Sequence, residues 1–190
     1  MIYGIGVDIV YLKRFDKLLL KTFLKPALSK LPSRSTTCLN NTNNTLEKIC
    51  NKFMHKNEWD YFCNQLESHN ERVKYIAGVW AIKESILKTL PDGNDILLPP
   101  TVTIYTKIFY KGVTMKKQDN DFIRGNNSVS SSSKPRIIID ESYVEEMIKN
   151  RDNKNKYKDF ITMLANSKFH VSLSHDGDYL IAYVVRVKDL

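Results

Sequence analysis

Asp8, Glu84 and Lys88 are the residues whose types and surroundings first suggest a chemical role. Asp8 shares the open side of an alternating segment with Gly4 and Gly6, and glycine inside a strand often marks a place where a ligand or another backbone approaches. Asp8 is therefore a candidate metal or phosphate ligand, although it would equally suit the N-cap of a following helix. Glu84 and Lys88 are spaced by one helical turn, so their charges share one side of a helix. An exposed ion pair, worth about 0.2–0.5 kcal/mol, is the simpler interpretation of these two residues.

A third stretch of interest lies near the C-terminus, where His175 follows Ser172 and Ser174 and precedes a predicted tight turn. The two hydroxyls and the imidazole stand at the mouth of a hairpin and suit contacts to a phosphate group. Polar residues also favour turns without any functional reason, so simple exposure of His175 is the alternative.

Basic residues gather on one flank of a predicted helix over residues 11–25, formed by Arg14, Lys17 and Lys21. This flank could bind an acidic protein helix, or it could be an ordinary solvated face. The formal net charge of +8 indicates an anionic partner. Nucleic acid, a phosphorylated small molecule, a membrane surface and an acidic protein all fit that description.

Length and composition predict one domain over residues 1–190, with polar insertions near 29–45 and 112–134. A hydrophobic content of 42% is enough for a substantial core. No apolar run approaches the length of a membrane span, and the first residues are typical of a strand rather than of a targeting sequence. We therefore expect an intracellular protein. The cysteines are odd in number and lack C-x-x-C spacing, which argues against a disulfide framework or a zinc site.

The hydrophobic patterns predict an α+β fold with a long central helix that includes Ala77–Leu90. Within that helix, Gly78, Ala81 and Ser85 form a stripe of small residues that lets another backbone come close. Helical spacing also marks residues 11–25, 46–66 and much of 141–165. Extended patterns predict strands at Tyr3–Val10, Thr101–Tyr110 and Arg136–Asp140, and a hairpin formed by Phe169–His175 and Tyr179–Val187.

The motifs GIGVDI at residues 4–9, AGVWAIKES at 77–85 and VSLSH at 171–175 occur at the two ends and in the middle of the chain. Together with Arg14-Phe15 and Lys88, they resemble the holo-acyl-carrier-protein synthase branch of the 4′-phosphopantetheinyl transferases. The Asn-rich and Ser-rich insertions are more similar to a fungal member than to the compact bacterial type. For such a member we expect a mitochondrial location, with the cytoplasm as the alternative.

The resemblance implies an activity and a set of site residues. Family members transfer the phosphopantetheine arm of coenzyme A to a serine of an apo acyl carrier protein, within fatty acid and lipid metabolism, and release adenosine 3′,5′-bisphosphate. Asp8 and Glu84 would bind Mg²⁺, which prefers a few carboxylates together with waters and substrate phosphates. Lys88 would bind a phosphate during catalysis, and Glu84, directly or through a metal-bound water, would take the proton of the carrier serine. Coenzyme A would also contact Lys83, Ser174 and His175.

The resemblance also implies an assembly and a docking surface. The family fold packs an antiparallel sheet with a long central helix and forms a homotrimer whose active sites lie between subunits. The stripe of small residues would then help close packing at that interface. The helix that carries Arg14, Lys17 and Lys21 would receive the acidic carrier protein, mainly by raising the encounter rate.

Two departures from the family pattern concern the nucleotide phosphates. Many relatives have an arginine where this chain has Val79, and a glycine-rich turn where it has Pro91–Asn94. Lys83 or a residue of an insertion is the expected substitute for the missing arginine.

A basic nucleic-acid-binding module is the main rival hypothesis, because the net charge alone is compatible with it. The chain lacks an arginine-rich helix, a ribonucleoprotein motif, a KH-type loop and zinc-finger spacing. A catalytically lapsed scaffold that still binds a carrier protein is the second rival. We expect neither a nucleic-acid partner nor a membrane partner.

Overall fold

The computed structural model describes residues 1–23, 44–93, 95–112 and 134–189. Nearly all of the two predicted polar insertions therefore lies outside the described residues. The helices and strands in chain order are β1 (Ile2–Tyr11), α1 (Leu12–Phe23), α2 (Asn44–Cys50), α3 (Lys56–Asn64), α4 (His69–Thr89), α5 (Thr101–Thr103), η1 (Ile104–Ile108), β2 (Phe109–Gly112), β3 (Arg136–Ile139), α6 (Glu141–Lys149), α7 (Arg151–Lys156), α8 (Lys158–Ala165), β4 (Ser167–Asp176) and β5 (Tyr179–Lys188).

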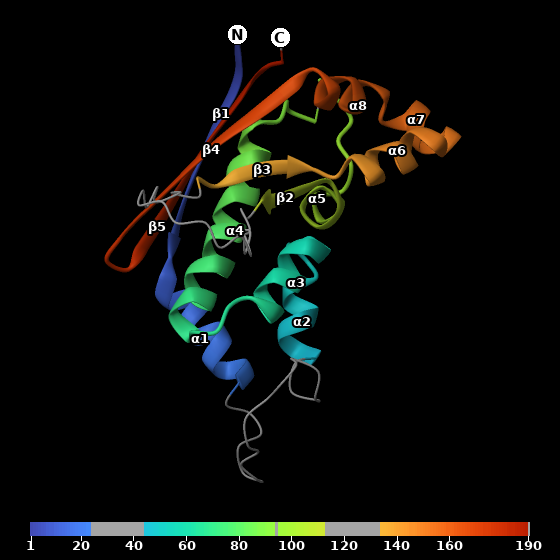
Figure 1. Ribbon diagram of the computed structural model, residues 1–190. Helices are drawn as coiled ribbons and strands as arrows, with labels where there is room; N and C mark the ends of the chain where they lie inside the picture. The colour runs from blue at the N-terminus through green and yellow to red at the C-terminus, as the bar shows by residue number, and fades with distance from the viewer. Residues whose placement is uncertain (24–43, 94, 113–133, 190) are drawn as a thin grey trace, which may run out of the picture.

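The three long strands form an antiparallel sheet in the order β1-β5-β4, so β1 and β4 are its edges (Figure 1). Asp8 of β1 pairs with Ala182 of β5, which pairs with Leu173 of β4. The predicted hairpin between β4 and β5 is confirmed. Gly177 in its turn has φ 53°, a left-handed conformation that glycine adopts without a steric penalty.

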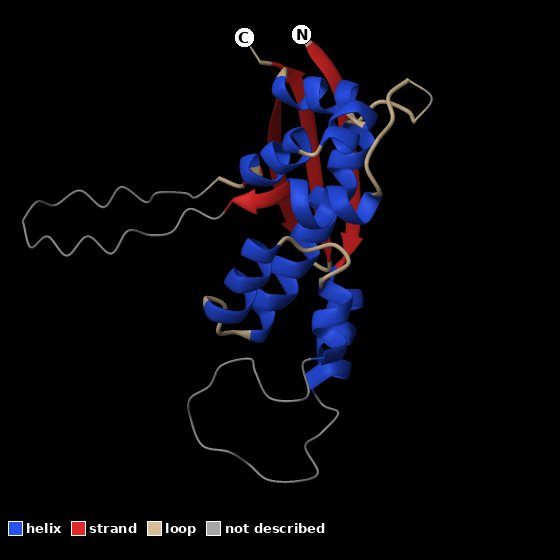
Figure 2. Cartoon of the chain, turned by 90° about the vertical axis from the view of Figure 1, so that its right-hand side faces the viewer, coloured by secondary structure: helices blue, strands red, loops and turns tan. Residues whose placement is uncertain are grey.

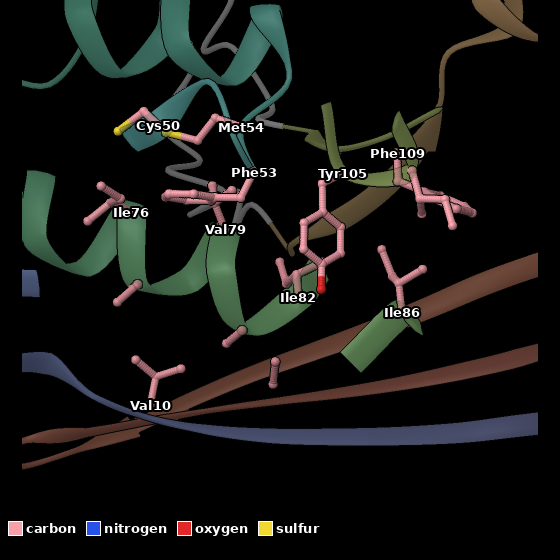
Figure 3. Packing of buried hydrophobic residues seen from close by; sticks show 14 of the residues in the cluster. Val10, Cys50, Phe53, Met54, Ile76, Val79, Ile82, Ile86, Tyr105 and Phe109 are labelled. Atoms are coloured by element: carbon pink, nitrogen blue, oxygen red, sulfur yellow. The ribbon is translucent and has the colours of Figure 1, made fainter. Parts of the chain in front are cut away.

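Helix α4 covers one face of this sheet, and Figure 2 shows the helices gathered on one side of the long strands. The helix begins at a capping box, in which the Ser68 hydroxyl accepts the Glu71 N–H and the Glu71 carboxylate accepts the Ser68 N–H. In Figure 3, α4 lies between the strands and a second layer that contains α2, α3 and the segment of Tyr105. The predicted α+β fold with a long central helix is confirmed.

The sequence suggested that the glycines of β1 lie on an open side. In the structure they lie against α4. A Cβ atom added to Gly6 would lie only 1.9 Å from the carbonyl oxygen of Ser85, and one added to Gly4 would lie 2.5 Å from that of Thr89. The Ser85 hydroxyl donates a hydrogen bond to the carbonyl oxygen of Ala182 in β5. The small residues of α4 therefore permit a close approach to the sheet of the same chain, and the prediction that they pack between subunits is wrong.

The opposite face of the sheet is apolar and exposed. The side chains of β1 that alternate with Gly4, Gly6 and Asp8 project away from α4, and the side chains paired with them on β5 do the same. Between 41% and 62% of each of these residues is exposed: Tyr3, Ile5, Val7, Ile9, Tyr11, Tyr179, Ile181 and Tyr183. A contiguous apolar surface of this kind usually indicates an interface.

The predicted strand Thr101–Tyr110 is wrong over most of its length. The segment forms the short helix α5 and the π-helical turn η1, and only its end joins β2, which pairs with β3 as expected. Ile104, Tyr105 and Ile108 are buried at helical spacing, with at most 5% of each residue exposed. Burial of these side chains in the core therefore overrides the β propensity of this stretch.

None of the described helices combines the length and the apolar composition that a membrane span requires.

Candidate active site

Asp8 lies inside β1, well before α1 begins, so the alternative role as an N-cap is wrong. Its Oδ1 atom accepts a hydrogen bond from the Lys88 ammonium at 3.0 Å, and the same ammonium donates to the carbonyl oxygen of Val7 at 2.7 Å. The two glycines of β1 allow this contact because they bring the strand close to the last turns of α4. Lys88 thus pairs with Asp8 across the two elements. The described residues give it no ion pair with Glu84, so the simple intrahelical pair is absent.

Glu84 is partly exposed and lies one turn before Lys88 on α4. Its Oε1 atom accepts a hydrogen bond of 2.7 Å from the hydroxyl of Tyr105 in η1. Burial, this hydrogen bond and the nearby carboxylates of Glu84 and Asp8 raise the pKa of the Tyr105 hydroxyl. The phenol therefore remains a neutral donor, and the two acidic side chains lie close enough to act on the same group.

The donor set at this point suits a magnesium ion. Mg²⁺ in proteins is usually held by one or two carboxylates, with waters and substrate phosphates completing its shell. Asp8 and Glu84 each have one carboxylate oxygen in a hydrogen bond, to Lys88 and Tyr105 respectively. The described residues contain no cluster of three or more His, Cys, Asp and Glu suited to a metal. The pair therefore fits an ion that depends on its substrate for further ligands.

Lys83 is not placed to bind coenzyme A, contrary to the sequence prediction. It is completely buried, and its ammonium forms an ion pair of 2.9 Å with the buried carboxylate of Glu58. The same ammonium donates to the carbonyl oxygens of Tyr105, at 2.6 Å, and Phe109. An ammonium has three N–H donors, and all three are used here, so Lys83 has none left for a nucleotide phosphate.

Ser174 and His175 lie at the other edge of the sheet, on β4. Register places His175 opposite the buried Leu180 and Ser174 opposite the exposed Ile181, so the two side chains lie on opposite faces of the strand. Both line a cavity of about 390 Å³ beside the first half of α4. In one chain, β5 lies between β4, which carries Ser174 and His175, and β1, which carries Asp8, so the structure does not bring all the predicted ligands together.

Two lysines in that cavity were missed by the sequence prediction. Lys74 and Lys111 line it together with His175. The Lys111 ammonium lies 4.7 Å from the centre of the Tyr75 ring, and no ion pair between described residues involves it. Burial lowers the pKa of Lys111. Neither lysine belongs to a recognisable motif, and only the fold shows that they share a cavity with His175. Val79, by contrast, is fully buried near Phe53 (Figure 3) and cannot contact a nucleotide.

The basic flank of α1 borders a second cavity, of about 740 Å³, between α1, α2 and α4. Arg14, Lys17 and Lys21 lie along it and are exposed, while aromatic side chains such as Trp80 form its apolar wall. The Arg14 guanidinium stacks at 5.6 Å from the Trp80 ring. Tyr105 lines the same cavity, so the basic flank leads directly to the hydrogen-bond partner of Glu84.

Comparison with known proteins assigns the family. Residues 4–124 match the family model of the 4′-phosphopantetheinyl transferase superfamily. This chain belongs to that superfamily. It is 34% identical over 188 residues to the mitochondrial holo-acyl-carrier-protein synthase of Saccharomyces cerevisiae, a match that covers 95% of this chain and 89% of the relative.

Other members of the superfamily agree with this assignment. The protein of the same name from Candida glabrata is 29% identical over 189 residues, which cover 98% of this chain and 95% of the relative. The crystal structure of a holo-acyl-carrier-protein synthase from Neisseria meningitidis superposes with a TM-score of 0.52 at 21% identity, over 99% of this chain and 100% of that one. This similarity shows that this phosphopantetheinyl transferase and the N. meningitidis protein share a fold.

Proposed function

We propose that this phosphopantetheinyl transferase moves the 4′-phosphopantetheine group of coenzyme A onto a serine of an apo acyl carrier protein and releases adenosine 3′,5′-bisphosphate. The observation that carries the proposal is the cluster of Asp8, Glu84 and Lys88, which β1 and α4 bring to one place in a chain of this superfamily. The names of the relatives from S. cerevisiae and C. glabrata describe the same activity.

The reaction forms a bond between the serine oxygen and the phosphorus next to the pantetheine, and breaks the bond from that phosphorus to the bisphosphate. Glu84 accepts the serine proton, because its carboxylate is partly exposed beside the cavity along α1. Lys88 contacts the phosphate under attack. Its side chain is half exposed, and the ion pair with Asp8 fixes the position of its ammonium group. Asp8 and Glu84 would hold Mg²⁺, which when bound would neutralise charge on the diphosphate and on the departing bisphosphate.

The nucleotide end of coenzyme A would bind in the cavity that contains Ser174, His175, Lys74 and Lys111. The lysines supply positive charge for phosphate, and the imidazole of His175 and the hydroxyl of Ser174 supply hydrogen-bond donors. Lys111 takes the place of the arginine that many relatives have where this chain has Val79. Since this cavity lies at the β4 edge of the sheet and Asp8 lies on the β1 edge strand of the same chain, we infer that the nucleotide spans two subunits. One chain would provide Asp8, Glu84 and Lys88, and its neighbour would provide the nucleotide cavity.

The exposed apolar face of β1 and β5 supports a homotrimer of this kind. It carries tyrosine, isoleucine and valine side chains that a stable monomer would not leave exposed side by side. β1 has Ile5, Val7 and Ile9 on this face and Asp8 on the other, so a neighbour that covers the face would lie beside the metal ligand.

The carrier protein would dock on the basic flank of α1. Arg14, Lys17 and Lys21 are exposed beside the cavity that leads to Tyr105 and Glu84, so a serine delivered there would reach the acceptor of its proton. Acidic residues of the carrier would pair with this flank. The names of the fungal relatives favour a mitochondrial location. The proposed acceptor is accordingly a mitochondrial acyl carrier protein, and the proposed pathway is fatty acid biosynthesis.

The deciding experiment is intact mass spectrometry of an apo acyl carrier protein incubated with this protein, coenzyme A and Mg²⁺. A gain of one phosphopantetheine that disappears with a chelator is the expected result. Asp8→Ala and Glu84→Ala should abolish the gain without lowering the melting temperature, because each removes a ligand and not a core group. Glu145→Ala, an exposed acid on α6, is the matched control. No gain with several carrier proteins, including a mitochondrial one, would favour the lapsed scaffold.

A further inference from the structure

Tyr105 makes two hydrogen bonds to two consecutive residues of α4. Its hydroxyl donates to the Glu84 carboxylate at 2.7 Å, and its carbonyl oxygen accepts from the Lys83 ammonium at 2.6 Å. In Figure 3 its ring reaches from η1 toward α4 beside Ile82. The backbone and the side chain of one residue are thus both tied to the helix, at the two positions that end the AIKE sequence.

The surroundings of Tyr105 keep this arrangement rigid. Only 5% of the residue is exposed, and Lys83, which fixes its carbonyl oxygen, is itself held by Glu58 in the core. The carbonyl oxygens that accept from Lys83 belong to Tyr105, inside the π-helical turn η1, and to Phe109, directly after it. A π-helical turn is a rare conformation that is frequent at functional sites. Tyr105 therefore presents its hydroxyl from a fixed position.

Glu84 does not need this hydrogen bond to compensate for burial, because its side chain is partly exposed and water could solvate it. Among the described residues, Tyr105 is the hydrogen-bond partner of Glu84 and no ion pair involves that carboxylate. The bond fixes one carboxylate oxygen and so sets the direction of the other. This is what a side chain that binds a metal and accepts a proton requires.

We propose that Tyr105 is a positioning residue that holds the Glu84 carboxylate in its working orientation, with Lys83 fixing Tyr105 in turn. The inference rests on the proposed function of Glu84. It also gives Lys83, the lysine of the AIKES motif, a role two contacts away from the reaction in place of the predicted contact to coenzyme A.

The variant Tyr105→Phe tests this proposal, because it removes the hydroxyl and keeps the ring in the core. Loss of a residue that orients a metal ligand typically lowers metal affinity or activity by about 10–100-fold. We expect kcat to fall by about 10-fold or more, while KM for coenzyme A and for the carrier changes by less than about threefold. Mn²⁺ binding to the full chain in the presence of coenzyme A, followed by electron paramagnetic resonance, should weaken by about 10-fold.

Two further variants separate positioning from packing. Tyr157→Phe removes a hydroxyl from another core tyrosine, remote from the site, and should leave Mn²⁺ affinity and kcat unchanged. If Tyr105 acts through Glu84, then Tyr105→Phe should not weaken Mn²⁺ binding further in a Glu84→Ala background.

The outcomes distinguish this inference from the proposed function. A wild-type protein that transfers nothing contradicts the proposed function. If the wild-type protein is active, two results would overturn the role of Tyr105 and leave the proposed function standing. One is a Tyr105→Phe variant with unchanged kcat and Mn²⁺ affinity. The other is a loss of Mn²⁺ affinity on Tyr105→Phe that is equally large in the Glu84→Ala background.

Discussion

Lys83 provides the clearest contrast between a role inferred from a motif and a role imposed by the fold. The resemblance assigns it to coenzyme A, whereas the structure places it in the core against Glu58, Tyr105 and Phe109. The substitution Lys83→Met separates the two, because methionine fills a similar volume without the charge. If Lys83 is structural, the variant should lose stability and retain its affinity for coenzyme A.

The magnitude follows from what the substitution leaves behind. Glu58 is only 1% exposed, and its carboxylate would lose its buried counter-ion. Breaking a buried pair by removing one partner costs about 3–5 kcal/mol. For a chain of this size each kcal/mol corresponds to about 2–4 °C, so the melting temperature should fall by about 6–20 °C. Two carbonyl oxygens, of Tyr105 and Phe109, would also lose their donor, which places the result in the upper part of this range.

Thermal and urea unfolding should be measured alongside steady-state kinetics at a temperature where the variant is folded. Lys107→Met, an exposed lysine on the same η1 segment, is the matched control and should melt within about 1 °C of the wild type. The double variant Lys83→Met with Glu58→Gln should recover part of the loss, because it removes the unpaired buried charge. A Lys83→Met protein with wild-type stability and a strongly raised KM for coenzyme A would refute the structural role and restore the motif-based one.

Four other predictions concern docking, nucleotide binding, assembly and pH. Reversing Arg14 and Lys17 to glutamate should raise KM for the carrier protein by about 10-fold or more and weaken its salt dependence, with KM for coenzyme A unchanged. If Lys111 binds the 3′-phosphate, Lys111→Met should raise KM for coenzyme A by about 10-fold and leave KM for 3′-dephospho-coenzyme A unchanged. An equal rise in KM for both substrates would exclude that contact. Ile5→Glu on the exposed face should give a folded monomer by light scattering that no longer transfers the group; an active monomer would contradict the shared site. Burial lowers the pKa of His55, and the hydrogen bond with Asp140 partly opposes this shift. The unfolded state therefore binds more protons than the folded state below about pH 6.5, so the free energy of unfolding falls as the pH drops through that value. His55→Asn, which keeps an N-cap acceptor, should flatten that part of the profile in urea unfolding at about pH 7.5 and about pH 5.5.

The elements that the sequence predicted well depend on short-range patterns. The β4–β5 hairpin follows from alternation around a glycine turn, and the central helix α4 follows from the helical spacing of apolar residues within Ala77–Leu90. The cluster of Asp8, Glu84 and Lys88 could be anticipated from the family resemblance, because its motifs place these residue types on two such elements. The elements need only neighbours in sequence, whereas the cluster joins Asp8 and Lys88, which lie 80 residues apart, and was anticipated only from the resemblance.

The features that the sequence did not predict depend on contacts between distant segments. Lys83 lies on a helix that is covered on both sides, so helical spacing cannot separate a buried from an exposed face. Its partner Glu58 comes from α3, and no sequence rule pairs the two. Tyr105 belongs to a stretch rich in β-branched residues, which forms a π-helical turn whose apolar side chains are buried in the core. The missed residues are therefore those whose role is set by the core.

The two faces of β1 connect assembly to chemistry in a way that neither feature explains alone. A strand in a small domain normally turns its apolar face inward, yet here the inward side of β1 carries Gly4, Gly6 and Asp8, and the apolar side is exposed. The inward glycines bring α4 close enough for Lys88 to bind both Asp8 and the carbonyl oxygen of Val7. The side chain of Val7 lies on the exposed face. A neighbouring subunit that packs against this face would thus act on the same residue whose carbonyl group fixes Lys88. If the proposed trimer forms, its assembly and the alignment of the proposed phosphate ligand would depend on one strand.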